Sequence, residues 1–195
     1  MNILYITANP KNIQDSTSLT IGKAFVDAYQ AAHPGDTLTT LDLYQADIGH
    51  LTLTDLNEMG SPAGLIQRSA AEFAKYDKYV IASPMWNLNI PSILKAYVDH
   101  IMAAGILFKY GAHGIPRGLM QGKKACVILS RGGAYGFWPL SAWAYDKRYL
   151  NRFFRFIGIT DIAFIEADGT ELHRDRVPQI REKGIQKAQK IAATF

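Results

Sequence analysis

The chain has little cysteine and no long hydrophobic run. Its single cysteine, Cys126, has no partner for an internal disulfide and stands in an apolar run, where it is expected to be buried. No stretch approaches the roughly 20 consecutive apolar residues of a membrane-spanning helix, and the chain opens on a short strand pattern instead of a basic segment followed by a long apolar one. The sequence therefore predicts neither a disulfide scaffold nor a membrane protein, and we expect a cytoplasmic location.

Closely spaced metal ligands are missing as well. The histidines are scattered along the chain without a close pair, at His33, His50, His100, His113 and His173. Zinc sites are typically built from cysteine and histidine side chains at short, regular spacings. The sequence thus predicts no metal site.

The charge balance is only mildly basic. Lysine and arginine number 21 against 17 aspartate and glutamate residues, which gives a formal net charge of +4. This balance favours anionic ligands such as phosphates and dinucleotides. Because the basic residues are dispersed and accompany no recognition motif, nucleic-acid binding is not predicted. At 195 residues with 48% hydrophobic content, the chain fits one compact domain over residues 1–195.

Short apolar runs alternate with segments of helical periodicity along the whole chain. The expected strands span residues 2–7, 37–43, 79–82, 124–130 and 161–166, and the expected helices span residues 16–33, 62–75, 91–102, 140–156 and 177–194. Residues 105–122 are glycine-rich and are expected to be irregular. Strands that alternate with helices form a parallel sheet with right-handed crossovers. The predicted fold class is α/β, a doubly wound five-stranded parallel sheet in the flavodoxin-like order 2-1-3-4-5.

Residues 83–91 follow the third expected strand and lead into a helix. In open α/β sheets, ligands bind at the carboxyl ends of the strands. The two asparagines of this loop provide amide donors and acceptors, while Met85, Trp86 and Leu88 provide flat or pliable apolar surface. This composition suits a planar heterocycle with polar edges. The alternative is a tight turn whose Trp86 fills the core.

The first expected strand leads into the sequence Asp15-Ser16-Thr17-Ser18 at the start of a helix. Free N–H groups and the helix dipole at such a position favour a phosphate, and the three hydroxyl groups add further donors. Ordinary N-capping is the alternative interpretation. Asp15 would repel a phosphate unless its side chain points away.

The fourth expected strand is followed by Ser130-Arg131-Gly132-Gly133. Two consecutive glycines suit either a close approach of the backbone to a ligand or a tight turn. Since the carboxyl ends of the first, third and fourth strands share one sheet edge in the predicted order, we expect this loop to lie beside the other two.

Together the three loops resemble those of the FMN-dependent NADH-azoreductases, also called NADH:quinone oxidoreductases. The resemblance covers nearly the whole chain and includes residues 108–110, 122–124 and 156–161. It implies FMN as the cofactor, with NADH or NADPH as the electron donor. The phosphate would be held by Ser16, Thr17 and Ser18, and Asn87 would bond the polar edge of the ring. The implied cofactor-binding residues are Asn9, Ser16, Thr17, Ser18, Pro84, Met85, Trp86, Asn87, Leu88, Ser130, Arg131, Gly132 and Gly133.

The resemblance also implies a homodimer and a small-molecule acceptor. Tyr110 and Phe156 would approach the substrate face of a flavin held by the partner subunit, and Tyr135 would influence the choice of substrate. The acceptor would be a quinone or an azo compound that receives two electrons in a ping-pong cycle, with no side-chain nucleophile. The helix over residues 91–102 also favours a dimer. Its apolar face is expected to be extended by Tyr97, Ile101 and Met102 towards Ala103-Ala104-Gly105, where small residues would let another helix approach closely.

Two other functions remain open at this point. A flavodoxin-type electron carrier would bind FMN without turning over an organic substrate, but such carriers are typically acidic, whereas this chain has a net charge of +4. A phosphate-ester hydrolase on the same fold would need an acid, a base or a metal centre, and the sequence indicates none.

Overall fold

A parallel β-sheet forms the centre of the molecule. The computed structural model describes residues 1–195, and its main sheet has the strand order β2-β1-β3-β6-β7. The strands are β1 (Asn2–Thr7), β2 (Thr37–Asp42), β3 (Lys78–Pro84), β6 (Lys124–Ser130) and β7 (Asp161–Ala167). All neighbouring pairs are parallel. Since β6 and β7 are the fourth and fifth strands of this sheet, the predicted order 2-1-3-4-5 is confirmed.

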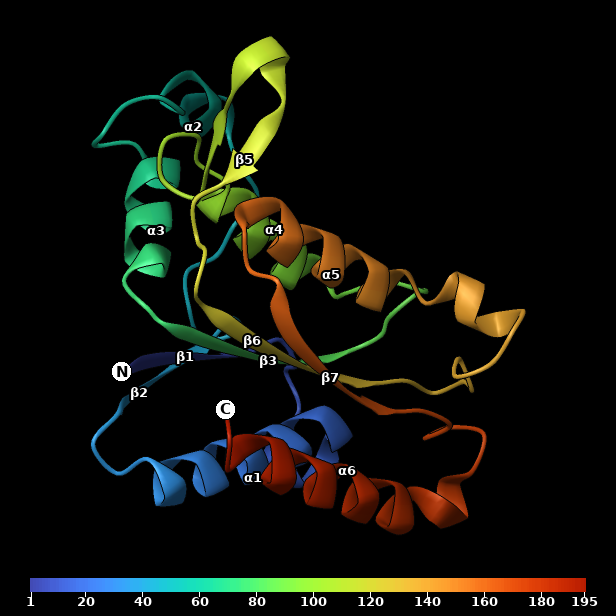
Figure 1. The fold of residues 1–195 in the computed structure, drawn as a ribbon. Helices are drawn as coiled ribbons and strands as arrows, with labels where there is room; N and C mark the ends of the chain where they lie inside the picture. Colours follow the sequence, from blue (N-terminus) through green and yellow to red (C-terminus); the bar gives the residue numbers. More distant parts are fainter.

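Helices cover both faces of the sheet (Figure 1). On one face lie α1 (Thr17–Ala32) and α6 (Val177–Ala192), and on the other lie α3 (Leu65–Ala74), α4 (Ser92–Ile101) and α5 (Tyr145–Ile157). The connections contain α2 (Leu53–Asn57) and the 3-10 helices η1 (Ile13–Asp15), η2 (Ala112–Gly114), η3 (Leu140–Trp143) and η4 (Arg174–Arg176). None of the helices combines the length and the apolar character needed to cross a bilayer.

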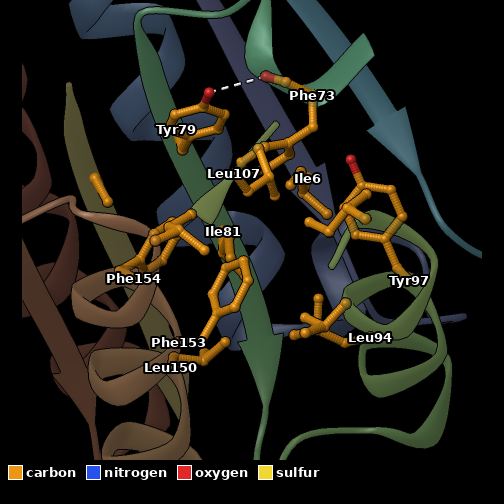
Figure 2. Close-up of a cluster of buried hydrophobic side chains, with 14 of the residues drawn as sticks. Ile6, Phe73, Tyr79, Ile81, Leu94, Tyr97, Leu107, Leu150, Phe153 and Phe154 are labelled. Atoms are coloured by element: carbon orange, nitrogen blue, oxygen red, sulfur yellow. Dashed lines mark hydrogen bonds between the residues drawn. The ribbon is translucent and has the colours of Figure 1, made fainter. Parts of the chain in front are cut away.

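The side chains of β3 show how the two faces are packed. Tyr79 and Ile81 belong to the core cluster between the sheet and the helices α3, α4 and α5 (Figure 2), whereas Val80 and Ala82 belong to the cluster on the side of α1 and α6. Successive side chains of a strand point to opposite faces. A strand covered on both faces is therefore apolar at nearly every position, which explains the unbroken run that predicts β3 from the sequence.

The stretch expected to be irregular contains an antiparallel hairpin. Its strands are β4 (Phe108–Tyr110) and β5 (Pro116–Gly118). The hairpin is tied to the end of α5, because the Met120 N–H donates to the Ile157 carbonyl oxygen at 2.8 Å. Gly118 lies so close to Gly158 that a Cβ atom on Gly118 would overlap the backbone there. The local sequence pattern does not predict the hairpin, because it depends on this distant contact.

The helix expected over residues 140–156 begins later than its periodicity indicates. η3 occupies its first residues, and Ala144 then has a non-helical ψ of 69° before α5 begins at Tyr145. The Tyr145 N–H donates to the Leu88 carbonyl oxygen at 3.1 Å. The chain therefore bends toward the loop after β3 before it becomes helical.

The apolar stripe of α4 faces the core of the same chain. Tyr97 is 8% exposed and Ile101 is 1% exposed, and both belong to the core cluster under α3, α4 and α5. The prediction is therefore wrong for Tyr97 and Ile101, because packing on the sheet already uses their face of the helix. Met102, the third residue of that prediction, stays half-buried and lines a surface groove. The outward face of α4 carries an exposed ion pair, Lys95 with Asp99, at 2.6 Å.

The contact between the hairpin and α5 makes a testable prediction. We expect Gly118→Ala to lower the free energy of unfolding by about 1–3 kcal/mol, because a new methyl group would overlap backbone atoms that cannot move aside. Gly35→Ala is the matched control, since nothing lies within 4 Å of a Cβ atom there. Urea denaturation followed by circular dichroism measures both variants, and equal stability of the two would contradict this account of the contact.

Candidate functional site

A cleft of about 590 Å³ opens at the carboxyl edge of the sheet. Its wall is built from the loops after β1, β3 and β6, from the segment that joins β7 to α6, and from the first turns of α6. The residues of the sequence-predicted set that line it are Asn9, Ser16, Thr17, Pro84, Met85, Trp86, Ser130 and Gly132. The structure thus brings the three predicted loops together in one cavity, as the strand order requires.

One end of the cleft is the N-terminus of α1. The Ser16 hydroxyl caps the helix by accepting a hydrogen bond from the Leu19 N–H at 3.3 Å, so the N-capping interpretation is confirmed. Asn9 holds the same hydroxyl, since its Nδ2 donates to Ser16 Oγ at 2.8 Å. Ser18 is fully buried, and its Oγ lies 3.2 Å from Ser16 Oγ. Ser16 and Thr17 therefore face the cleft, whereas Ser18 supports them from behind.

Charged side chains surround this end of the cleft. Lys11, Arg174 and Arg181 contribute positive charge, and Asp15 and Glu171 contribute negative charge. Arg174 is already neutralised by Glu171, because its Nη2 lies 2.6 Å from that carboxylate. The remaining cations and the dipole of α1 make this end suitable for an anion, although Asp15 opposes them.

The loop after β3 forms a tight turn that leaves Met85, Trp86 and Leu88 outside the core clusters. Trp86 and Asn89 exchange backbone hydrogen bonds of 2.8 and 3.0 Å. Between them, Asn87 and Leu88 have positive φ values of 49° and 71°. Such values are strained for leucine and tend to occur at functional sites. Trp86 is 40% exposed, so the interpretation that it merely fills the core is wrong.

Trp86 separates the cleft from a second groove. That groove has a volume of about 430 Å³ and is lined by Trp86, Asn87 and Tyr149, among others. Asn87 therefore lies beside the cleft instead of on its wall. The role of Asn87 at the edge of a bound ring stays a prediction, and so does that of Leu88, which lines neither cavity.

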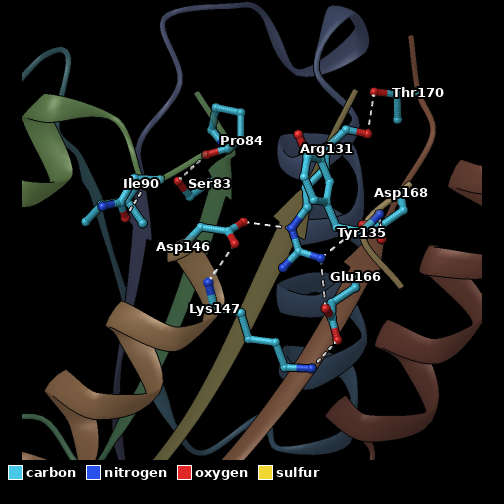
Figure 3. A network of polar contacts seen from close by, with 11 residues as sticks. Ser83, Pro84, Ile90, Arg131, Tyr135, Asp146, Lys147, Glu166, Asp168 and Thr170 are labelled. Atoms are coloured by element: carbon cyan, nitrogen blue, oxygen red, sulfur yellow. Dashed lines mark hydrogen bonds and ion pairs between the residues drawn. The ribbon is translucent and has the colours of Figure 1, made fainter. Parts of the chain in front are cut away.

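The side chain of Arg131 lies outside the cleft, in a buried ionic network (Figure 3). Its Nε donates to Asp146 Oδ2 at 2.8 Å, and its Nη1 donates to Glu166 Oε2 at 2.9 Å and to Asp168 Oδ1 at 3.1 Å. Lys147 Nζ donates to the other oxygen of Glu166 at 2.6 Å. The side chain of Arg131 joins the end of β6 to α5 and β7. Only the backbone of Arg131 therefore remains available for the predicted contact with a cofactor.

The pKa values of Arg131, Glu166 and Asp168 are shifted in this network. Burial lowers the pKa of Arg131, but its bond to Asp146 and the other carboxylates outweigh burial and raise this pKa overall. Burial raises the pKa of Glu166, yet Lys147 and Arg131 lower it by more, so the net shift is downward. For Asp168, burial outweighs the attraction of Arg131 and raises the pKa. The two carboxylates differ because Glu166 has two cationic partners and Asp168 has one.

The glycines after β6 allow side chains to pack against the loop. A Cβ atom on Gly132 would lie 2.9 Å from Glu171 Cγ, and one on Gly133 would lie 2.9 Å from the Tyr135 ring. Tyr135 itself lines a separate groove of about 420 Å³, beside Glu166 and Asp168. Its predicted contact with a substrate stays a prediction.

Tyr110 and Phe156 lie together on the surface. Both rings pack against Phe108, with centroid distances of 5.5 and 4.9 Å. Tyr110 is 65% exposed and Phe156 is 36% exposed, and neither lines the cleft of its own chain. This position is compatible with a role toward another subunit and excludes direct contact with the cleft of the same chain.

Sequence reasoning missed the contribution of the segment between β7 and α6. Thr170, Glu171 and Arg174 come from this segment, Arg181 comes from α6, and Lys11 comes from the loop after β1. The sequence shows a basic residue about one turn into α6, and this position was the signal that could have identified Arg181. Because Arg181 is far in sequence from the loop after β1, the sequence gives no sign that it contacts Gln14 and Thr17.

No group of three or more histidine, cysteine, aspartate or glutamate side chains is placed to hold a metal ion.

The fold and the cleft define a flavodoxin-like α/β protein, and comparison with known proteins agrees. Residues 1–192 match the family model described as a flavodoxin-like fold. A relative from Caldicellulosiruptor bescii, an FMN-dependent NADH:quinone oxidoreductase, is 40% identical over 199 residues, which cover 99% of this chain and 98% of the relative. The chain therefore belongs to the flavodoxin-like family of FMN-dependent NADH:quinone oxidoreductases, which confirms the resemblance seen in the sequence.

Solved structures agree with this membership. The crystal structure of azoreductase AzrA superposes with a TM-score of 0.92 at 29% identity and covers 100% of both chains. An FMN-dependent NADH-azoreductase from Bacillus anthracis, solved in complex with FMN, has a TM-score of 0.88 at 27% identity and covers 100% of this chain and 99% of that chain. The similarity thus extends over the whole fold.

The buried network makes a prediction about stability. Arg131→Met should lower the free energy of unfolding by about 3–5 kcal/mol, because the fully buried Asp146 carboxylate would lose its cation. Replacing both residues, Arg131→Met with Asp146→Leu, should recover part of this loss. Lys95→Met breaks only an exposed pair and should cost at most about 1 kcal/mol. If chemical denaturation gives Arg131→Met no larger effect than Lys95→Met, the network does not hold the loop.

Proposed function

We propose that the protein is an FMN-dependent oxidoreductase that passes electrons from NADH to quinones and azo compounds. The observation that carries the proposal is the composition of the cleft, where hydroxyl groups and a helix N-terminus stand at one end and Met85 and Trp86 stand at the other. FMN has a phosphate and a planar ring, and these two ends match its two parts. The names of the relative and of the solved structures support the same assignment.

The hydroxyl end would hold the phosphate. Ser16 and Thr17 lie on the wall where free N–H groups of α1 add donors and a favourable dipole. Asn9 orients Ser16 by its bond to the hydroxyl oxygen, and Ser18 backs the same hydroxyl. This arrangement gives Asn9 a positioning role toward Ser16.

The other end would hold the ring. Met85 is joined to the loop after β6, since its N–H donates to the Ser130 carbonyl oxygen at 2.8 Å. The exposed indole of Trp86 and the thioether of Met85 provide apolar surface for a flat ligand, while the turn at Asn87 presents an amide beside it. Because the turn is closed by backbone bonds on both sides, these groups are fixed before a ligand arrives.

The protein side chains bind and orient, and the cofactor carries the chemistry. When bound, FMN accepts two electrons as a hydride from a nicotinamide and passes them to an acceptor. No histidine or cysteine lines the cleft, so the residues there serve to position ligands and to stabilise charge. We infer a ping-pong cycle, in which donor and acceptor occupy the same place in turn.

Binding of FMN is the first test of this proposal. The purified chain should be yellow, or become so with added FMN, and a quinone should reoxidise it after reduction by NADH. Thr17→Val, which removes one hydroxyl at constant size, should weaken FMN binding by about 1–3 kcal/mol. Thr20→Val is the matched control, because the Thr20 hydroxyl bonds only to backbone carbonyls of the same segment. Absence of flavin absorbance after reconstitution and gel filtration would refute the proposal.

We further propose that the protein acts as a homodimer whose sites are shared. Tyr110 and Phe156 stand outside their own cleft and are available to a second subunit. A groove of about 410 Å³ between α4 and α5, lined by Val98, Met102 and Phe153 among others, continues this apolar surface to Phe156. Interface cores are rich in aromatic residues and methionine, and two-fold dimers are the commonest closed assembly.

Subunit mixing tests the shared site. One parent carries Ser16→Ala with Thr17→Val and has lost FMN binding, and the other carries Tyr110→Ala with Phe156→Ala. After exchange, some heterodimers should regain one complete site, so the activity of the mixture should exceed that of either parent. Tyr44→Ala, at an exposed aromatic residue that lines neither the cleft nor the groove between α4 and α5, should behave as wild type. A monomer by light scattering, or proven exchange without a gain, rules the shared site out.

A further inference from the structure

Arg181 reaches the start of α1 from the last helix of the fold. α6 and α1 lie side by side on one face of the sheet (Figure 1). Gly184 makes this close approach possible, because a Cβ atom on it would overlap the side chain of Ile21. Arg181 stands three residues before Gly184, about one helical turn away. The tight packing therefore fixes the part of α6 that carries Arg181 beside the N-terminus of α1.

The guanidinium of Arg181 makes contacts that leave its charge available. Its Nε donates to Thr17 Oγ1 at 3.2 Å, and its Nη1 donates to the Gln14 carbonyl oxygen at 2.8 Å. Both acceptors are neutral, no carboxylate forms an ion pair with Arg181, and Nη2 has no protein acceptor. Arg181 is only partly exposed and lines the cleft together with Ser16 and Thr17. An unneutralised cation therefore stands at the hydroxyl end of the cleft.

The bond to Thr17 also orients its hydroxyl group. A hydroxyl has one hydrogen to donate and an oxygen that accepts. Because Arg181 occupies the oxygen as a donor, and Thr17 Oγ1 makes no other hydrogen bond, the hydroxyl hydrogen remains for an acceptor in the cleft. The contact thus presents two donors, the guanidinium and the hydroxyl, to the same place.

Arg174 provides an internal comparison on the same wall. Its Nε and Nη2 both donate to Glu171 Oε2, at 2.9 and 2.6 Å, and its side chain is largely exposed. Its charge is paired and screened by water, so it offers little to a ligand. Asp15 adds a negative charge to the wall, which only an unpaired cation can offset.

We propose that Arg181 is a phosphate-binding residue that makes the cleft select a phosphorylated flavin over riboflavin. This inference rests on the proposed function and adds a residue to it. The guanidinium offers a charge-assisted hydrogen bond to a phosphate dianion, an interaction that riboflavin cannot make because it ends in a neutral hydroxyl. This contact adds to the selection made by the hydroxyl groups and the helix N-terminus, because only the phosphorylated ligand gains it.

The test compares two flavins on the full-length chain freed of bound flavin. Quenching of flavin fluorescence gives the Kd of FMN and of riboflavin for each variant. Arg181→Gln should weaken FMN binding by about 10- to 100-fold and leave the Kd of riboflavin within about twofold of wild type. Arg176→Gln is the matched control and should change neither value, because this arginine is exposed and does not line the cleft. The salt dependence of FMN binding should also be weaker for Arg181→Gln, because one charged contact is missing.

Each alternative result is decisive. If Arg181→Gln loses equal affinity for FMN and riboflavin, Arg181 only supports residues 14–17. If its affinity for FMN is unchanged, Arg181 does not bind the phosphate. Either result overturns the inference and leaves the proposed function standing. If Arg181→Gln does not fold, Arg181→Lys replaces it in the test. This variant retains the positive charge and should retain most of the preference for FMN over riboflavin. A folded Arg181→Lys protein that has lost the whole preference would contradict phosphate binding by charge. Wild-type protein that binds neither flavin overturns the proposed function itself.

Discussion

The parallel register of β1, β3 and β6 holds the walls of the cleft side by side. Thr7 of β1 pairs with Ala82 of β3, and Pro84 of β3 pairs with Ser130 of β6, so β3 and β6 end together and β1 ends opposite Ala82, shortly before the end of β3. Parallel strands leave their carboxyl ends on one edge, and every loop that follows them must begin there. The core on both faces of β3 fixes this register, because a slip by one residue would exchange the side chains that face α4 with those that face α1.

On this frame, rigid contacts keep the loops in place. The Arg131 network fixes the loop after β6 by joining it to α5 and β7, and the turn at Asn87 and Leu88 is closed by backbone bonds to Trp86 and Asn89. The positive φ values in that turn store strain of order 1–3 kcal/mol per residue, which the surrounding bonds offset. A site fixed in this way loses little conformational freedom when a ligand binds.

The sequence predicts the main sheet well and the polar contacts of the site poorly, for a physical reason. Strands such as β6 are continuous apolar runs whose burial is a local property, so β6 is predicted with its correct ends. The apolar stripe of α4 is also visible, but periodicity does not say whether Tyr97 meets the sheet or a partner. From the sequence, Arg131 is interpreted as a loop residue near a ligand. Its carboxylate partners cannot be recognised there, because they lie 15 to 37 residues away along the chain. Contacts of that kind are set by the fold and leave no local pattern.

The contact between α1 and α6 joins residues that are 164 positions apart in sequence. Thr17 is synthesised well before Arg181, so the wall of the cleft that they share cannot form on a nascent chain until α6 has left the ribosome. A chain that folds in the order of its synthesis would build the sheet strands first and complete this wall after them. Cofactor loading would then follow the emergence of α6, and the bound ligand would stabilise only chains in which α6 has docked.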